Sequence, residues 1–231
     1  MSDATPGEAF SPNLAVSTVI FTLHPGADGT SELALPLVRR IRAPYEGQWA
    51  LPGGPLTADE DLAQAASRTL LETTSLQPRY LEQLYAFGRL DRSPAERVVS
   101  IVYWALVASD EADRVLNDEN VQWFLADALP ELAFDHKLIV EYALWRLRTK
   151  LEYSQIAHGF LGETFTLAQL REVYEAVLQK PLDPGNFRRM MESSGAVVAT
   201  GERLSGTRHR PPQLYKFDTS TNHASTSGVS A

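Results

Sequence analysis

The stretch that decides the fold is residues 54–76, GPLTADEDLAQAASRTLLETTSL. Residues 57–75 have the spacing of an amphipathic helix, because apolar side chains recur every three or four positions. These apolar side chains are Leu62, Ala65, Ala66 and Leu70. Thr57 is the expected N-cap, since Glu60 three residues later completes a capping-box pattern. The Pro-Gly-Gly at residues 52–54 predicts a tight turn leading into this unit.

Apolar, β-branched segments on both sides of this helix predict strands. The segments before it cover residues 13–23 and 32–40, joined by a turn rich in proline and glycine. The segments after it cover residues 80–90, 97–108 and 121–124. Strands gathered around one well-marked helix predict an α/β or α+β domain that ends near Pro130.

Beyond residue 134 the apolar spacing becomes helical. Residues 137–151 predict a helix with Leu138, Tyr142 and Trp145 on one side, to which Ile139 can be added. Residues 166–179 predict a second helix, capped by Thr166, and residues 184–194 predict a short third helix.

Two short apolar runs, residues 196–200 and 213–217, follow these helices and flank a polar, basic loop. Three helices followed by a basic β-hairpin are typical of a winged helix-turn-helix domain. The sequence therefore predicts an α/β sheet domain followed by a C-terminal winged helix.

The net charge of the 231 residues is −8, from 21 basic and 29 acidic residues, and this sum argues against a nucleic acid partner. However, residues 184–217 contain six basic and two acidic residues, so this segment carries +4 and the remainder −12. Its basic residues belong to the third helix and the hairpin loop, the two parts of a winged helix that contact DNA. We expect double-stranded DNA as a partner; a solvated basic loop is the alternative.

The candidate DNA contacts fall into two groups. The first group lies on the third helix, which is expected to place base-reading or phosphate-binding side chains in the major groove. The second lies on the hairpin loop, expected along the backbone or in the minor groove, where arginine is favoured. The candidates are Asn186, Arg188, Arg189, Arg203, Arg208, His209 and Arg210.

The composition is that of a globular protein, with 44% hydrophobic and 22% charged residues. The absence of cysteine excludes disulfides, thiolate metal sites and cysteine nucleophiles. We see neither a signal-peptide pattern nor an apolar stretch of membrane-spanning length, and therefore expect a cytoplasmic protein without a membrane partner. Residues 1–12 and 219–231 are polar enough that we expect them to be disordered.

The opening stretch resembles the Nudix box, a 23-residue Gly-x5-Glu-x7-Arg-Glu-U-x-Glu-Glu-x-Gly-U pattern in which U is a bulky apolar residue. The positions in register are Gly54, Glu60, Arg68, Leu70, Glu72 and Leu76. The resemblance extends over roughly the first 130 residues and implies a Nudix-fold sandwich. The alternative is an alanine-rich helix that matches by accident.

The departures from the box concern its chemistry. In the family, three carboxylates on one helix face hold Mg²⁺ against a pyrophosphate. Here those positions are Thr69, Glu72 and Thr73, and Ser75 replaces the closing glycine. We expect no catalytic residues, no metal site and no required cofactor, with Glu60 and Arg68 available for a structural ion pair. With this box we expect at most weak, Mg²⁺-dependent ADP-ribose pyrophosphatase activity.

The resemblance implies that a retained pocket binds a nucleoside diphosphate compound. Arginines near the pocket are candidate phosphate donors, and aromatic side chains are candidates for stacking on a base. These candidates are Arg39, Arg40, Arg42, Trp49, Phe87, Arg92 and Arg97. Solvated loop cations and core packing are the respective alternatives.

An incomplete Nudix box followed by a winged helix resembles the NrtR family, the Nudix-related transcriptional regulators of NAD metabolism. The resemblance covers nearly the whole chain, up to Asp218. It implies a homodimeric repressor of genes for NAD biosynthesis or salvage that responds to ADP-ribose, NAD or a related nucleotide. The expected division is residues 13–133 for ligand sensing and residues 134–218 for DNA binding.

The alternative function is an active Nudix hydrolase of ADP-ribose or a similar compound. A third hypothesis combines the two, with slow hydrolysis resetting a repressor. The sequence leaves open which metabolite is the effector, whether it releases DNA or promotes binding, the operator sequence and the target genes.

Overall fold

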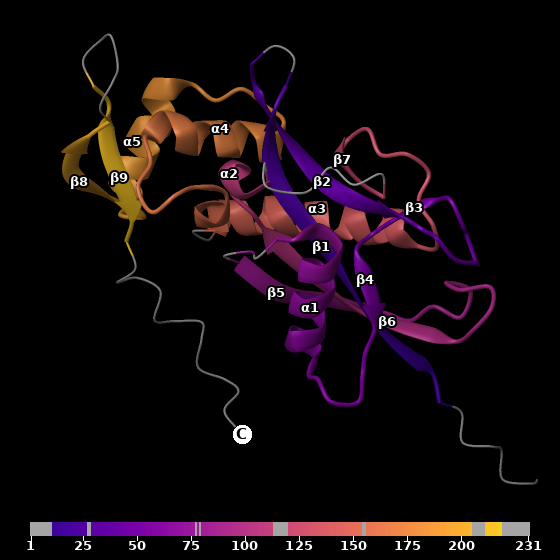
Figure 1. Ribbon diagram of the computed structural model, residues 1–231. Coiled ribbons are helices and arrows are strands. Elements are labelled where there is room, and N and C mark those ends of the chain that lie inside the picture. The colour runs from indigo at the N-terminus through magenta and orange to yellow at the C-terminus, as the bar shows by residue number, and fades with distance from the viewer. Residues whose placement is uncertain are drawn as a thin grey trace, which may run out of the picture.

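The computed structural model describes residues 11–26, 29–76, 78, 80–112, 120–153, 156–204 and 211–218. Figure 1 shows a sheet domain that continues into a helical part and a small hairpin. The elements are β1 (Asn13–Pro25), β2 (Ser31–Arg39), β3 (Trp49–Ala50), β4 (Gly53–Pro55), α1 (Leu62–Thr74), β5 (Tyr80–Phe87), β6 (Val98–Leu106), α2 (Ser109–Ala112), β7 (Val121–Leu125), α3 (His136–Tyr153), η1 (Ile156–Phe160), α4 (Leu167–Leu178), α5 (Pro184–Ser194), β8 (Val197–Arg203) and β9 (Gln213–Phe217). The predicted fold class is confirmed.

The main sheet is mixed and is built around β1. Its strand order is β3-β2-β1-β6-β5, with β4 paired to β1 and β7 paired to β2. β1 pairs in parallel with β6, from Asn13 opposite Val98 to Phe21 opposite Leu106, and antiparallel with β2. Residues 16–22 of β1 are all buried, which requires cover on both faces of the sheet.

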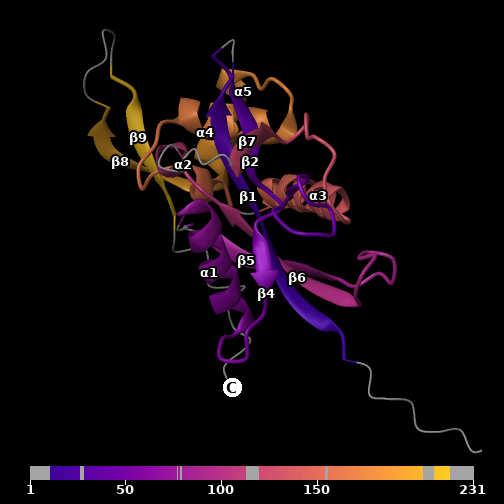
Figure 2. The same ribbon diagram turned by 45° about the vertical axis from the view of Figure 1, so that its right-hand side comes forward.

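Helices supply this cover from opposite sides (Figures 1 and 2). Because successive strand residues point to opposite faces, Phe21 and Trp104 pack in the cluster that contains α3. Ile20 and Ala105 point the other way, into a cluster with Leu70 of α1. The sheet is therefore a layer between α1 and α3, as the sandwich prediction required.

The start of α1 differs from the prediction. The helix begins at Leu62, and its N-cap is Asp61. The Asp61 carboxylate accepts a hydrogen bond from the Gln64 N–H at 2.8 Å, and the Gln64 side-chain oxygen accepts one from the Asp61 N–H. Thr57 is therefore not the cap. The Glu60 carboxylate does accept from the Thr57 N–H at 2.9 Å, but this bond lies in the loop before the helix.

The packed side of α3 also differs from the predicted apolar side. Ile139, Val140, Ala143, Leu144, Leu147 and Leu151 are buried. By contrast, Leu138 and Trp145 keep 46% and 54% of their surface exposed. Ile139 therefore belongs to the packed side, opposite the predicted stripe, and α3 has a second apolar side that faces outward.

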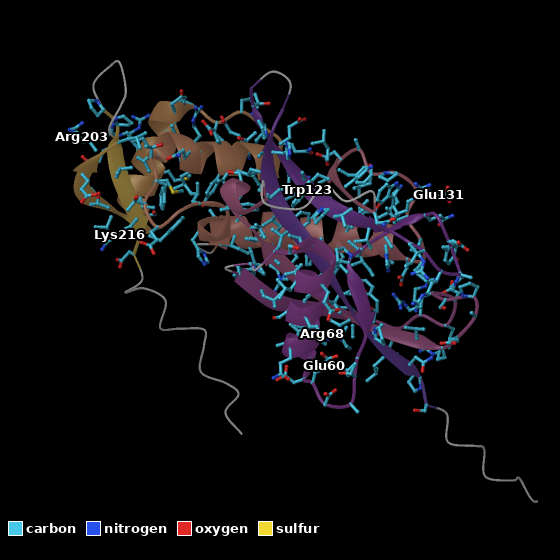
Figure 3. All side chains as sticks on the ribbon, viewed as in Figure 1. Glu60, Arg68, Trp123, Glu131, Arg203 and Lys216 are labelled. Atoms are coloured by element: carbon cyan, nitrogen blue, oxygen red, sulfur yellow. The ribbon has the colours of Figure 1, made fainter. Side chains whose placement is uncertain are left out.

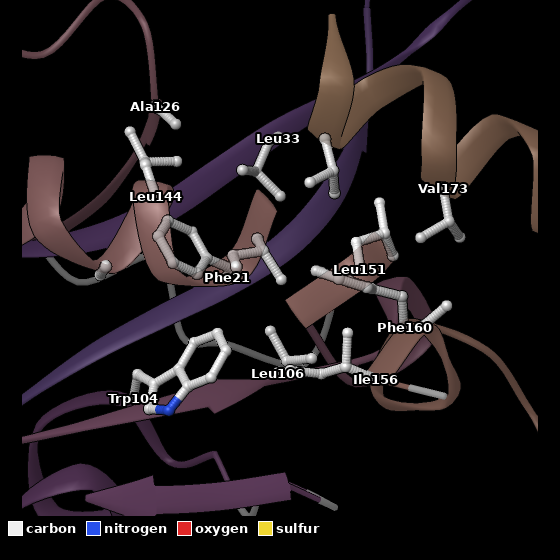
Figure 4. Packing of buried hydrophobic residues seen from close by; sticks show 14 of the residues in the cluster. Phe21, Leu33, Trp104, Leu106, Ala126, Leu144, Leu151, Ile156, Phe160 and Val173 are labelled. Carbon is white, nitrogen blue, oxygen red and sulfur yellow. The ribbon is translucent and has the colours of Figure 1, made fainter. Parts of the chain in front are cut away.

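One hydrophobic cluster runs from the sheet into the winged helix (Figure 4). It includes Phe21 and Trp104 of the sheet, Leu151 of α3, Phe160 of η1 and Val173 of α4. In addition, the Arg148 guanidinium on α3 donates to the Val177 carbonyl of α4 at 3.0 Å. The division between residues 133 and 134 stays a prediction, since α3 packs against both parts.

The winged-helix elements form as predicted. Thr166 caps α4 through a capping box with Gln169, and Asp183 caps α5, with Pro184 in its first turn. β8 and β9 pair antiparallel, and Tyr215 of β9 exchanges backbone hydrogen bonds with Phe165 at 2.8 and 2.9 Å. These contacts anchor the hairpin to the helical part. Among the described residues, none of the helices combines the length and apolarity needed to cross a membrane.

Replacing the observed cap tests the corrected start of α1. Asp61→Ala should lower the free energy of unfolding by about 1 kcal/mol, because an N-cap carboxylate satisfies an otherwise unpaired helix N–H. Thr57→Ala is the matched control and should change stability by less than about 0.5 kcal/mol, since its exposed hydroxyl bonds only to the carboxylates of Asp59 and Glu60 in the loop before the helix. Urea denaturation of both variants decides between the caps; a larger loss in Thr57→Ala would restore the original prediction.

Candidate functional site

The loop before α1 is fixed to the helix by the Glu60–Arg68 ion pair, labelled in Figure 3. Two Arg68 nitrogens donate to the Glu60 carboxylate at 2.6 and 2.8 Å, and the third donates to the Glu72 carboxylate at 3.2 Å. The hydrogen bonds from Arg68 lower the pKa of Glu60 to about 2, with the Thr57 N–H adding to the effect. Glu60 is therefore charged at neutral pH, and this charge is neutralised by Arg68. The contact confirms the predicted ion pair.

The two threonines of the Nudix box point their hydroxyls at the helix backbone. Thr69 is 3% exposed and donates to the Ala65 and Ala66 carbonyls, and Thr73 donates to the Thr69 carbonyl. Neither hydroxyl is arranged as a metal ligand, and Glu72 is left as a single carboxylate beside them. No cluster of three or more metal-ligating side chains occurs in the described part of the chain. The residues present do not fit the Mg²⁺ that the Nudix family uses.

A cavity of about 540 Å³ lies next to β4 and is lined by Gly53 and Gly54 of this strand. This volume is in the range of nucleotide and drug-sized sites. Gly53 has to be a glycine, because a Cβ there would collide with the Val16 carbonyl of β1. The wall-forming side chains used below are Ser17, Arg40, Arg92, Ser100, Phe134 and His136.

Arg40 is the cation of this cavity that has no carboxylate partner among the described residues. Its guanidinium donates to the Pro44 carbonyl at 2.8 Å and lies 4.6 Å from the centre of the Phe134 ring. Partial burial lowers its pKa from the usual arginine value, but the group stays charged at neutral pH. A positioned and uncompensated guanidinium suits a phosphate oxygen.

Arg92 lines the same cavity but is already paired. Its guanidinium makes a bidentate contact with Asp135 at 2.8 and 3.1 Å, and the two side chains are 5% and 12% exposed. The pair holds the loop between β5 and β6 against the start of α3. Arg92 can still offer remaining N–H groups, but it adds no net charge.

His136 supplies a neutral imidazole. Its Nδ1 accepts from the Leu51 N–H at 3.0 Å, which leaves the proton on Nε2. Burial lowers the pKa of His136 to about 4, with Arg92 and Arg40 adding to the shift and Asp135 opposing it. At neutral pH the side chain is therefore an uncharged hydrogen-bond donor in the cavity wall.

The other predicted ligand contacts lie outside this lining. Arg39 donates to the Gly47 carbonyl at 3.2 Å, and exposed Arg42 contributes only its carbonyl to Arg40. Trp49 packs against Phe124, with ring centres 5.1 Å apart. Arg97 donates to the Gly88 and Arg89 carbonyls at 2.7 and 3.0 Å and so shapes the β5–β6 loop.

Phe87, the remaining predicted contact, lies against Tyr85 and Tyr142. The ligand roles of all these residues stay predictions, and Arg40 and Arg92 are the two that the structure brings together. Sequence reasoning missed Phe134, Asp135 and His136, because their contacts with Arg40, Arg92 and Leu51 cross 43 or more residues. The turn with positive φ at Phe134 gives no clear signal in the sequence.

The predicted DNA contacts that the structure describes lie on exposed surfaces of α5 and the hairpin. Arg188 forms an i,i+4 pair with Glu192 at 3.0 Å, and Arg189 donates to the Asn186 side chain. Arg203, labelled in Figure 3 with exposed Lys216, donates to the Pro211 carbonyl at 2.8 Å. Arg208, His209 and Arg210 lie outside the described residues.

Comparison with known families assigns both parts of the chain. Residues 157–217 match the NrtR DNA-binding winged helix domain, and residues 15–143 match the NUDIX domain. The “ADPR responsive transcriptional repressor NtrR” of Acinetobacter baylyi is 35% identical over 213 residues, which is 90% of this chain and 82% of that protein. The chain belongs to the NrtR family.

Solved structures agree with this NrtR assignment. The crystal structure of Shewanella oneidensis NrtR has a TM-score of 0.76 and 36% identity, covering 89% of this chain and 94% of that one. The same protein complexed with a 27mer DNA has a TM-score of 0.74 and 34% identity, covering 89% and 93%. Its NUDIX domain complexed with ADP ribose has a TM-score of 0.52 and 34% identity, covering 63% and 94%.

An enzyme is also among the relatives. The ADP-ribose pyrophosphatase of Methanocaldococcus jannaschii is 34% identical over 129 residues, which is 54% of this chain and 76% of that protein. Since the match is confined to about half of the chain, it concerns the Nudix part of this NrtR family member and not the whole protein.

The low pKa of His136 predicts a loss of stability in mild acid. The unfolded histidine takes up a proton below about pH 6.5, whereas the folded one does so only near pH 4, so stability is full above pH 6.5 and falls between these values. In His136→Asn, the amide oxygen replaces the acceptor for Leu51 without titrating. Urea unfolding at pH 8, 6 and 4.5 should show a flatter decline in the variant; parallel declines would contradict the assignment.

Proposed function

We propose that this chain is a DNA-binding transcriptional repressor of NAD biosynthesis or salvage genes, whose Nudix part senses ADP-ribose or a related NAD metabolite. The observation that carries the proposal is the nucleotide-sized cavity kept beside a Nudix helix whose carboxylates are replaced by Thr69 and Thr73. Such a site can bind a pyrophosphate compound without the metal that cleaves it. The assignment as a repressor follows the Acinetobacter relative.

The effector site is the cavity between β4 and the start of α3. In this proposal Arg40 binds a phosphate oxygen of the ligand, while Phe134 holds the guanidinium in place. His136 donates a hydrogen bond to an acceptor on the ligand, and the Ser17 and Ser100 hydroxyls, 3.1 Å apart, give further polar contacts. The ADP ribose complex of the Shewanella NUDIX domain supports this class of ligand.

The DNA-binding element is α5 with the β8–β9 hairpin. The N-terminal half of α5 presents Asn186, Arg188 and Arg189 on its exposed side, while Phe187 and Met191 anchor the opposite side in the core. The pairs of Arg188 with Glu192 and of Arg189 with Asn186 are exposed, so DNA can replace them at small cost. Arg203, Arg208, His209 and Arg210 of the hairpin are the proposed backbone or minor-groove contacts.

We propose that the protein acts as a homodimer. A single winged helix reads a small site, whereas two copies read half-sites about one helical turn, roughly 10 base pairs, apart. The 27mer in the Shewanella complex is long enough for two such half-sites. A ligand then alters repression only if it binds one arrangement of the two copies more tightly than another.

The alternative, efficient ADP-ribose hydrolysis, has the support of the Methanocaldococcus relative. Against it stand the two threonines turned to the helix backbone and the use of Glu60 by Arg68. We propose that no metal is needed for effector binding, and that any Mg²⁺-dependent activity is residual.

The neighbouring residues Arg40 and Arg39 test the effector site. Arg40→Ala should weaken ADP-ribose binding at least about tenfold in calorimetry without Mg²⁺, because it removes a charge-assisted phosphate contact. Arg39→Ala has the same change of charge outside the cavity and should stay within about twofold. Equal effects of both variants would contradict the site. Release of AMP by the wild type with Mg²⁺ at ordinary enzyme turnover would favour the hydrolase.

The proposed role of α5 in DNA binding is tested by Arg189→Ala. This variant should weaken binding to the chain's own upstream DNA about tenfold or more in a mobility-shift titration, since α5 loses a base or phosphate contact. Arg89→Ala, which removes another exposed charge, from the β5–β6 loop, is the control and should bind normally. Unchanged affinity in Arg189→Ala and in further substitutions across α5 and the hairpin would reject the DNA-binding assignment.

A further inference from the structure

The outward side of α3 is apolar, and much of it stays exposed in the described chain. Leu138, Tyr142 and Trp145 recur at helical spacing on this side, opposite the buried side that packs against the sheet. Leu138 is 46% exposed and Trp145 is 54% exposed. A helix that is apolar on both sides is normally covered on both, so the isolated chain leaves one contact unmade.

Strand β5 extends this apolar side into a continuous face. Tyr85, which is 57% exposed, lies 5.6 Å from both Phe87 and Tyr142, measured between ring centres. Tyr142 in turn lies 5.4 Å from Trp145. We call these residues, Tyr85, Phe87, Leu138, Tyr142 and Trp145, the α3/β5 face. β5 ends the strand order of the main sheet, so the face is not continued by a further strand.

Charges of both signs border the α3/β5 face. Lys137, Arg146 and Lys150 on α3 lie near Glu141 on α3 and Glu82 on β5, where Glu82 pairs with Lys150 and lies 3.9 Å from Arg146. The chain as a whole carries −8, so two copies repel each other over most of their surface. At this face charges of both signs are present, so basic side chains of one copy can meet acidic side chains of the other.

We propose that the α3/β5 face is the contact between two copies of this chain. This inference rests on the proposed homodimer and assigns its surface. In a twofold dimer the same patch lies on both sides of the contact, so it must be complementary to itself, as an aromatic patch bordered by charges of both signs can be. DNA and anionic membranes require a basic surface instead, and the face lacks one.

The α3/β5 face also adjoins residues of the effector cavity wall. Leu138 lines a second hollow of about 230 Å³ together with Phe134, Asp135 and Arg92. Phe134 and Arg92 line the effector cavity as well. A ligand that displaces Phe134 or the Arg92–Asp135 pair therefore acts on residues next to the dimer contact, which gives the effector a short route to the arrangement of the two copies.

Leu138 and Leu71 provide a matched test. Each lies on a helix and keeps 46% of its surface exposed, but the two helices cover opposite faces of the sheet. Leu138 belongs to the α3/β5 face, and Leu71 lies on α1. Sedimentation equilibrium of the full chain should give a dimer for the wild type and for Leu71→Glu. Leu138→Glu and Trp145→Glu should raise the dimer dissociation constant at least about 30-fold, as for central aromatic and apolar contacts.

The outcomes separate this inference from the proposed function. Circular dichroism and ADP-ribose binding report whether each variant is folded, and both should be retained because the substituted side chains are half exposed. Folded Leu138→Glu and Trp145→Glu variants that remain dimeric as tightly as the wild type would overturn the face, while leaving the repressor intact. A monomeric wild type would overturn both the face and the proposed homodimer, without affecting the effector or DNA assignments.

Discussion

The burial of one side of α3 is the interaction on which the rest of the structure depends. At its first residue, His136, the helix forms part of the effector cavity and accepts a hydrogen bond from Leu51. Further along, Leu147 and Leu151 pack in the cluster that joins the sheet to η1 and α4, and Arg148 donates to the Val177 carbonyl. Since protein interiors are closely packed, a shift of this helix cannot be absorbed locally. The Nudix part and the winged helix are thus joined through the packed side chains of α3.

The Nudix helix shows how a fold can be kept while its chemistry is changed. Arg68 and Glu60 still tie the loop to α1, and Gly53 still allows β4 to approach β1 closely. Thr69 and Thr73 keep the helix packed and satisfied through backbone hydrogen bonds. The scaffold of the cavity therefore depends on residues other than those at the carboxylate positions of the Nudix box.

The sequence predicted those parts of the molecule that rest on local patterns. The order of strands and helices and the cap at Thr166 followed from spacing and turn residues, and the NrtR assignment followed from the resemblance of the Nudix box and winged helix to that family. The cap of α1 was wrong, because Thr57 and Asp61 both stand three residues before an amide or carboxylate side chain, Glu60 and Gln64, and only the fold selects between them.

Long-range contacts accounted for what the sequence could not predict. Arg39 and Arg40 are equivalent in the sequence, yet the alternation of β2 and the following turn bring only Arg40 to the cavity. Likewise, α3 has two apolar sides of similar length, and which of them meets the sheet depends on the register of the whole core. His136 became a candidate contact only through Leu51, 85 residues earlier in the chain.

The central claim is that one chain couples a nucleotide in the Nudix cavity to DNA on the winged helix. Its most direct test is the affinity for the chain's own upstream DNA, measured by fluorescence anisotropy at fixed salt, with increasing ADP-ribose. The account predicts a saturable change in operator affinity, of either sign, which Arg40→Ala moves to at least about tenfold higher ADP-ribose. Operator affinity that stays constant while calorimetry shows the cavity to be filled would contradict the coupling.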